Sequence, residues 1–129
     1  MTEPEQNVYT QIGAVGFERL VAAFYRHVAE EPLLRPLYPE EDLRPAARRL
    51  RLFLEQFFGG PTTYLLERGH PRLRMRHSPF RIDQAARDAW VRHMIAALDE
   101  AEIPEPAYST MRVYFERTAT GLINSYLPT

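Results

Sequence analysis

Residues 45–61, PAARRLRLFLEQFFGGP, contain the clearest helical segment of the chain. Pro45 suits the first turn of a helix, where a backbone N–H has no intrahelical partner to lose. The residues that follow carry an apolar stripe at helical spacing, and Gly59-Gly60-Pro61 ends the helix. The stripe consists of Ala46, Leu50, Phe53, Leu54 and Phe57. The segment therefore predicts one amphipathic helix with a defined start and end.

Helical spacing of apolar residues predicts three further helices, and no alternating strand pattern occurs. The first follows Gly13 and ends before Pro32, the second starts at the N-cap candidate Asp83, and the last starts near Pro106. Their stripes are Phe17, Leu20, Val21, Phe24 and Val28; Ala86, Trp90, Met94, Ala97 and Leu98; and Met111, Phe115, Ala119, Leu122 and Tyr126. Residues 61–82 show only fragments of helical period and predict a long irregular excursion. The expected fold class is all-α, with four main helices.

Length and composition describe one ordinary globular domain. The chain has 129 residues, 45% hydrophobic and 26% charged, and we expect a single domain over residues 1–129 with a flexible tail over residues 1–7. A net charge of −1 argues against a protein that binds nucleic acid through its phosphates. The acidic start is no signal peptide, and no apolar run reaches about 18 residues. We therefore expect a cytoplasmic protein without a membrane span.

Two missing residue types exclude whole classes of chemistry. Without cysteine there is no disulfide, thiolate zinc site or cysteine nucleophile. Without lysine there is no P-loop and no Schiff-base chemistry, since every positive residue is an arginine. The serines lack a nucleophile elbow. The histidines are therefore the remaining candidates for metal binding or acid–base chemistry.

Four histidines are candidates for metal or acid–base chemistry: His27, His70, His77 and His93. No two of them have the i, i+4 spacing of a helical zinc site, so a three-ligand zinc centre is not expected. His27 and His93 border apolar stripes and indicate ordinary boundary residues. His70 and His77 lie in the excursion, where no acidic residue occurs over residues 72–81. That segment predicts either a basic loop or a site for an anionic ligand, with one histidine turned inward.

One inward imidazole, many apolar and aromatic side chains, and arginines at the mouth of a cavity are features of a haem pocket. Neutral imidazole supplies the axial ligand of the iron, and cationic side chains pair with the two propionates. A packed helical bundle is the better explanation of each aromatic residue when it is taken alone. The residues by themselves leave both interpretations open.

Several longer stretches, in order along the chain, resemble the group II, or O-type, truncated haemoglobins. They are Phe24-Tyr25, residues 37–43 (LYPEEDL), residues 50–56 (LRLFLEQ) with Gly59-Gly60-Pro61, Tyr64, residues 68–80 (RGHPRLRMRHSPF) and residues 87–90 (RDAW). The resemblance extends from about Val8 to about Ser125. It implies a globin-like, truncated two-over-two helical sandwich that encloses one haem b.

The resemblance also implies roles for individual residues. It makes His77 the proximal ligand of the iron, and it makes Tyr25, Tyr38 and Trp90 a polar distal cluster. The implied propionate contacts are Arg49, Tyr64 and, more weakly, Arg76. The implied apolar haem contacts are Leu50, Phe53, Leu54 and Leu73, with Ala46 and Leu50 on the distal face.

The function implied by the resemblance is reversible binding of oxygen and of other diatomic gases such as NO and CO. Hydrogen-bond donors in the distal cluster would slow the release of oxygen. Two alternatives stay open: a haem-dependent NO dioxygenase or peroxidase, and a haem-free helical interaction module. The enzyme would need an external reductase, because the chain contains no flavin or nicotinamide domain. The oligomeric state, including a homodimer, stays open as well.

Overall fold

The computed structural model describes residues 4–125, which form six α-helices and one 3₁₀-helix. The elements are α1 (Pro4–Glu30), η1 (Arg35–Leu37), α2 (Arg44–Phe57), α3 (Thr63–Arg68), α4 (Leu73–His77), α5 (Gln84–Glu100) and α6 (Ala107–Gly121). No strand occurs in this part of the chain, so the predicted all-α class is confirmed. None of its helices is long and apolar enough to cross a membrane.

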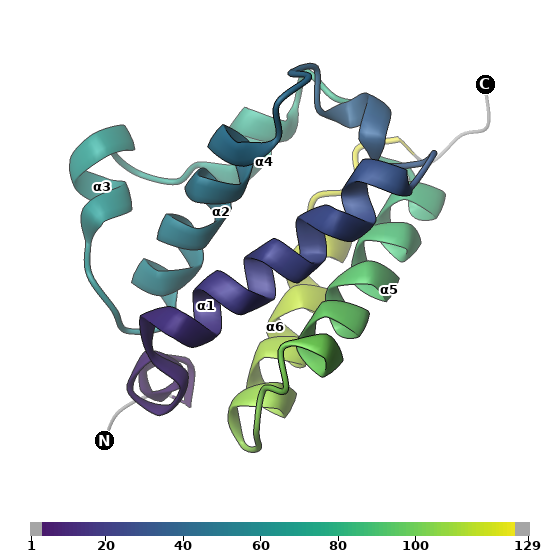
Figure 1. Cartoon of the computed structure of the whole chain (residues 1–129). Helices are drawn as coiled ribbons and strands as arrows, with labels where there is room; N and C mark the ends of the chain where they lie inside the picture. Colours follow the sequence, from purple (N-terminus) through teal and green to yellow (C-terminus); the bar gives the residue numbers. More distant parts are fainter. Residues whose placement is uncertain (1–3, 126–129) are drawn as a thin grey trace.

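The four long helices form two packed pairs. Helix α1 packs against α2, helix α5 packs against α6, and α1 also contacts both α5 and α6 (Figure 1). The apolar stripes predicted from the sequence meet where the pairs cross, because burying them removes apolar surface from water. Among the fully buried side chains are Phe17, Leu20, Phe24, Leu54, Phe58, Met94, Leu98, Met111 and Phe115. This arrangement is the expected two-over-two sandwich. Tyr126, the last residue of the predicted stripes, lies outside the described residues.

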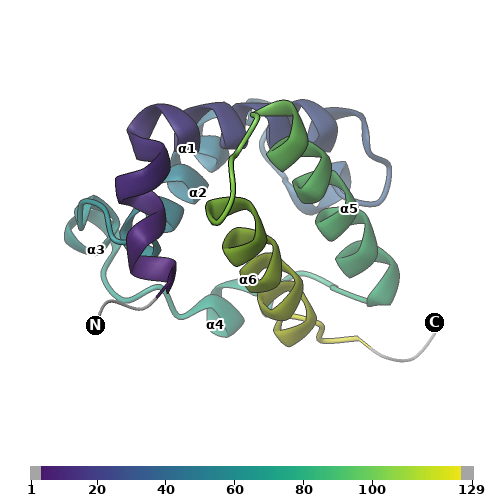
Figure 2. The same cartoon turned by 90° about the horizontal axis from the view of Figure 1, so that it is seen from below.

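Helix α1 is longer than predicted and changes direction at Gly13. Gly13 has φ 65° and ψ 179°, a positive-φ conformation that glycine adopts without steric cost. Figure 2 shows the two segments of α1 at a steep angle to each other. Residues 4–7, expected as part of a tail, form the first turn of the helix. The first segment is held by long-range contacts: Val8 is buried, and the Tyr9 N–H donates to the Phe58 carbonyl at 2.9 Å.

The excursion between α2 and α5 contains two helices that the periodicity did not predict. Helix α3 has six residues and α4 has five, too few for a repeating apolar stripe. Contacts from the C-terminal segment hold the region after α4. Asn124 Nδ2 donates to the Phe80 carbonyl at 2.8 Å, and the Ile82 N–H donates to Asn124 Oδ1 at 2.8 Å. Tertiary contacts of this kind do not appear in local sequence patterns.

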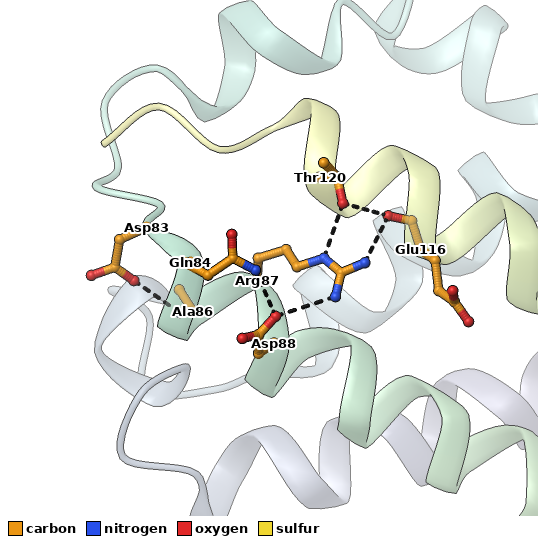
Figure 3. A network of polar contacts seen from close by, with 7 residues as sticks. All are labelled: Asp83, Gln84, Ala86, Arg87, Asp88, Glu116 and Thr120. Atoms are coloured by element: carbon orange, nitrogen blue, oxygen red, sulfur yellow. Dashed lines mark hydrogen bonds and ion pairs between the residues drawn. The ribbon is translucent and has the colours of Figure 1, made fainter. Parts of the chain in front are cut away.

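Asp83 is confirmed as the N-cap of α5, because its Oδ1 accepts the Ala86 N–H at 2.9 Å (Figure 3). We expect Asp83→Ala to lower the free energy of unfolding by about 1 kcal/mol, since it leaves this N–H without its acceptor. Urea unfolding followed by circular dichroism, at a fixed haem-to-protein ratio, measures the change. Asp83→Asn keeps an acceptor and is the control. Equal stability of Asp83→Ala and the unmodified protein would contradict the capping role.

Candidate functional site

A cavity of about 550 Å³ is lined by residues of all six α-helices, of η1 and of the segment after η1. Its size falls in the range of roughly 300–1,000 Å³ that is typical of sites for small molecules and cofactors. All twelve residues that the sequence analysis assigned to a haem site line this one cavity. They are Tyr25, Tyr38, Ala46, Arg49, Leu50, Phe53, Leu54, Tyr64, Leu73, Arg76, His77 and Trp90. Their individual roles stay predictions.

His77 ends helix α4 and lines the cavity with one ring nitrogen left to bind a ligand. Its Nδ1 lies 2.7 Å from the carbonyl oxygen of Leu73. A carbonyl only accepts hydrogen bonds, so Nδ1 carries the hydrogen and the neutral ring keeps its lone pair on Nε2. His70 differs, because it is exposed and its Nδ1 accepts the Arg72 N–H at 3.2 Å. Only His77, of these two, belongs to the cavity wall.

Three polar aromatic side chains meet on the wall that α1, α5 and the segment after η1 form. The rings of Tyr25 and Tyr38 are edge-to-face with their centroids 5.6 Å apart. Trp90 and Tyr25 both lie within hydrogen-bonding reach of the Tyr38 hydroxyl, and the Tyr25 hydroxyl donates to the Ala46 carbonyl at 3.5 Å. Burial raises the pKa of both phenols above the ordinary value for tyrosine. Both hydroxyls therefore keep their hydrogens at neutral pH and act as donors.

Packing fixes the orientation of Trp90. Its ring is edge-on to Phe24 with centroids 5.3 Å apart and edge-on to Phe115 with centroids 5.7 Å apart. The predicted stripe of α5 is confirmed, because Ala86, Met94 and the residues that continue it are buried. The indole is thus held from both sides by elements α1 and α6.

Arginines bring positive charge to the cavity wall. Arg49 Nη2 lies 3.7 Å from Glu40 Oε1, and the Arg49 side chain is partly exposed. Arg76 is bound to the loop before α4, since its Nε donates to the Pro71 carbonyl at 2.7 Å and its Nη2 to the Arg68 carbonyl at 2.9 Å. Arg49 is therefore the freer of the two guanidinium groups, while Arg76 supports the loop that carries His77.

Arg87 is a cavity residue to which the sequence analysis gave no role. Its Nε donates to Thr120 Oγ1 at 3.0 Å and its Nη2 to the Glu116 carbonyl at 3.3 Å, while Nη1 pairs with Asp88 Oδ1 at 3.2 Å (Figure 3). These contacts join α5 to α6 about one turn before Trp90. The i, i+3 spacing of Arg87 and Trp90 is the signal that could have placed both at the same wall.

The donor set of this cavity suits haem. Apolar walls can enclose a porphyrin, the Nε2 lone pair of His77 can ligate iron, and guanidinium groups can pair with propionates. Every buried side-chain nitrogen and oxygen within residues 4–125 has a hydrogen-bond partner. A two-over-two helical fold around such a cavity defines a haem protein of the globin class.

Comparison with known proteins identifies the family. The bacterial-like globin family matches residues 7–124. Group 2 truncated hemoglobin YjbI of Bacillus subtilis (strain 168) is 42% identical over 120 residues, which cover 90% of this chain and 87% of that protein. The chain belongs to the bacterial-like globin family, and it is similar to group II truncated haemoglobins. Globins are haem proteins, so haem b is the cofactor that fits the cavity.

Solved structures agree in fold over nearly the whole chain. The haemoglobin of Chloroflexus aurantiacus superposes with a TM-score of 0.89 at 53% identity, covering 92% of this chain and 98% of that one. The group II truncated haemoglobin of Bacillus anthracis superposes with a TM-score of 0.88 at 35% identity, covering 92% and 97%. The truncated globin fold is thus shared along the chain.

Proposed function

We propose that the protein binds oxygen, and other diatomic gases such as NO and CO, reversibly at a haem held by His77. When bound, haem supplies an iron with one coordination position for a gas molecule. The observation that carries the proposal is the combination, in one cavity, of a free His77 Nε2 with a cluster of three donors, Tyr25, Tyr38 and Trp90.

The chain's own residues would hold the cofactor in three ways. The Leu73 carbonyl orients the His77 ring, as outer partners of ligating histidines generally do. Arg49 and Tyr64 are the side chains we assign to the propionates, and Arg76 supports the loop. The apolar contacts we assign are Leu50, Phe53, Leu54 and Leu73.

Among the three polar aromatic residues, Tyr38 is the one that we assign as hydrogen-bond donor to the gas molecule. A hydroxyl has one hydrogen to give, and the Tyr38 oxygen already takes part in hydrogen bonds with Tyr25 and Trp90. When the Trp90 N–H donates to it, and the Tyr25 hydroxyl donates to it rather than to the Ala46 carbonyl, its own hydrogen is left for a gas molecule in the cavity. Ala46 leaves room beside the cluster because its side chain is a single methyl group. At about 1 kcal/mol for each hydrogen bond, the Tyr38 donor alone would slow release by roughly 5-fold, and a second direct donor would bring this to more than 10-fold.

Replacing Trp90 by phenylalanine is expected to speed oxygen dissociation several-fold. The change keeps a large aromatic ring and removes the N–H, which corresponds to a loss of roughly 1 kcal/mol. Tyr38→Phe removes a hydroxyl and is expected to act in the same direction. The free-energy effect of the double variant on oxygen dissociation should differ from the sum of the two single effects, because the two side chains interact with each other. Stopped-flow displacement of oxygen by carbon monoxide measures these rates.

Both variants must retain the haem absorbance of the unmodified protein for the rates to be comparable. Unchanged dissociation rates in both single variants would reduce Trp90 and Tyr38 to packing residues and leave Tyr25 as the distal donor. No Soret absorbance, even after hemin is added, would instead establish a haem-free interaction module and overturn the proposed function as a whole.

A second candidate function is a haem-dependent redox reaction, either the oxidation of NO or the turnover of peroxide. The three-donor cluster favours it, because slow release keeps oxygen available for reaction rather than delivery. Such an enzyme would take electrons from an external reductase. Nitrate formation that continues over many cycles with a reductant present would support this function. Formation that stops after one equivalent would count against it.

A further inference from the structure

Two histidines that the sequence analysis treated as ordinary boundary residues face each other between α1 and α5. The Nδ1 atoms of His27 and His93 lie 3.1 Å apart, and the ring centroids are 5.0 Å apart. The side chains are 27% and 18% exposed, respectively. Neither histidine belongs to the wall of the haem cavity. The pair is therefore a separate cluster with access to solvent.

A carboxylate holds the far nitrogen of each ring. His93 Nε2 lies 2.7 Å from Glu31 Oε1, and His27 Nε2 lies 2.8 Å from Glu100 Oε1. Glu31 Oε1 also accepts from Arg92 Nη2 at 2.9 Å, so this side chain is an acceptor for two donors. A carboxylate gives no hydrogen, so both Nε2 atoms carry one. In a ring that carries a single hydrogen, the lone pair is then on Nδ1.

Two lone pairs that face each other at 3.1 Å need a cation between them. A proton bound to one Nδ1 would make that ring the donor of a hydrogen bond to the other ring. A metal ion would instead bind the lone pairs of both rings. Two imidazole nitrogens about 2.0–2.1 Å from a zinc ion, at a near-tetrahedral angle, lie about 3.3–3.4 Å apart, so a separation only slightly larger than the observed one would admit the ion. A carboxylate on the far nitrogen is also the usual support of a histidine that ligates a metal. Here both rings have that support.

We propose that His27 and His93 form a two-histidine site for Zn²⁺. Imidazole nitrogen favours zinc over Mg²⁺ and Ca²⁺, which prefer oxygen ligands. Within residues 4–125 no group of three or more His, Cys, Asp or Glu side chains can hold a metal, so the pair offers two protein ligands and water would fill the remaining positions. Both side chains are partly exposed to solvent.

The charged side chains next to the two histidines carry no excess negative charge that would attract a cation. Glu31 and Glu100 supply two negative charges, and Arg92 and Arg26 balance them at 2.9 Å and 3.8 Å. Specificity must therefore come from the imidazole nitrogens rather than from excess negative charge. The search for i, i+4 spacing in the sequence missed this site because its histidines lie on different helices.

The test is isothermal titration of the haem-loaded protein with ZnCl₂ at neutral pH. We expect saturable binding of one Zn²⁺ per chain. His27→Gln and His93→Gln should each weaken it by more than the roughly 10-fold that loss of an outer partner costs. His70→Gln is the matched control, because it removes an exposed histidine outside the pair. Zinc should raise the melting temperature of the unmodified protein and of the control, but not of the pair variants.

Several results would overturn the zinc site. One is the absence of saturable zinc binding by the unmodified protein, which needs no variant to interpret. Another is unchanged zinc affinity in His27→Gln or His93→Gln with haem absorbance and helicity intact, and a third is an equal loss in His70→Gln. Binding of Mg²⁺ with similar affinity would assign the ion to the carboxylates instead. None of these results depends on gas binding, so this proposal and the proposed function can fail separately.

Discussion

Replacing His77 by glycine is expected to strip haem from the protein, or to leave haem binding dependent on added imidazole. The change removes the one ring nitrogen that the cavity offers to iron, while the space left by the ring can admit free imidazole. The Soret absorbance per mole of protein, measured after gel filtration with and without imidazole, reports haem retention. A low ratio that imidazole restores is the expected pattern.

The matched variant is His70→Gly, which removes a histidine seven residues earlier in the same basic segment. His70 is exposed and does not line the cavity, so its loss should leave the Soret absorbance unchanged. Loss of haem in His70→Gly together with a normal spectrum in His77→Gly would reverse the assignment of the proximal ligand.

Phe58→Ala is expected to lower the free energy of unfolding by about 3–5 kcal/mol, because it opens a cavity in the core. Phe58 is fully buried at the end of α2, and its ring packs against Phe17, Tyr114 and Phe115 with centroid distances of 6.0, 5.3 and 6.4 Å. It thus joins α1, α2 and α6 at one point. The expected loss is a large part of the roughly 5–15 kcal/mol that stabilises a typical domain.

Urea unfolding followed by circular dichroism measures this change, with the haem-to-protein ratio held fixed because a bound cofactor adds stability. Leu66→Ala is the control, since its side chain is 83% exposed and its removal should change the free energy by no more than about 0.5 kcal/mol. Similar losses in the two variants would show that Phe58 does not anchor the core.

The long helices could be predicted because each carries its own local signals. Residues 45–57 combine a proline in the first turn with a full apolar stripe, and the observed α2 spans Arg44–Phe57. The Asp83 cap likewise placed the start of α5. Helices α3 and α4 and the first segment of α1 lack such signals. They are too short for a repeating stripe, and long-range contacts such as the Tyr9–Phe58 hydrogen bond hold them in place.

The residues of the candidate site were predicted from the family resemblance rather than from the helical periodicity. The stretches around Tyr38, His77 and Trp90 pointed to haem-site residues that the fold brings to one cavity. Arg87 was missed, because nothing in its local spacing shows that Thr120 and Glu116 of α6 would receive its guanidinium (Figure 3). Arg76 was placed at the site, but its bonds to loop carbonyls could not be foreseen from the sequence.

The class of the fold, the long helices and the candidate haem ligand could be predicted from the sequence, because apolar period, capping residues and family motifs are properties of contiguous residues. The tertiary structure alone decided which distant groups meet. His27 and His93 are 66 residues apart, and only the packing of α1 against α5 brings their Nδ1 atoms to 3.1 Å. Helical spacing reports contacts within one helix, and pairing between helices depends on how the buried faces of the whole chain fit together.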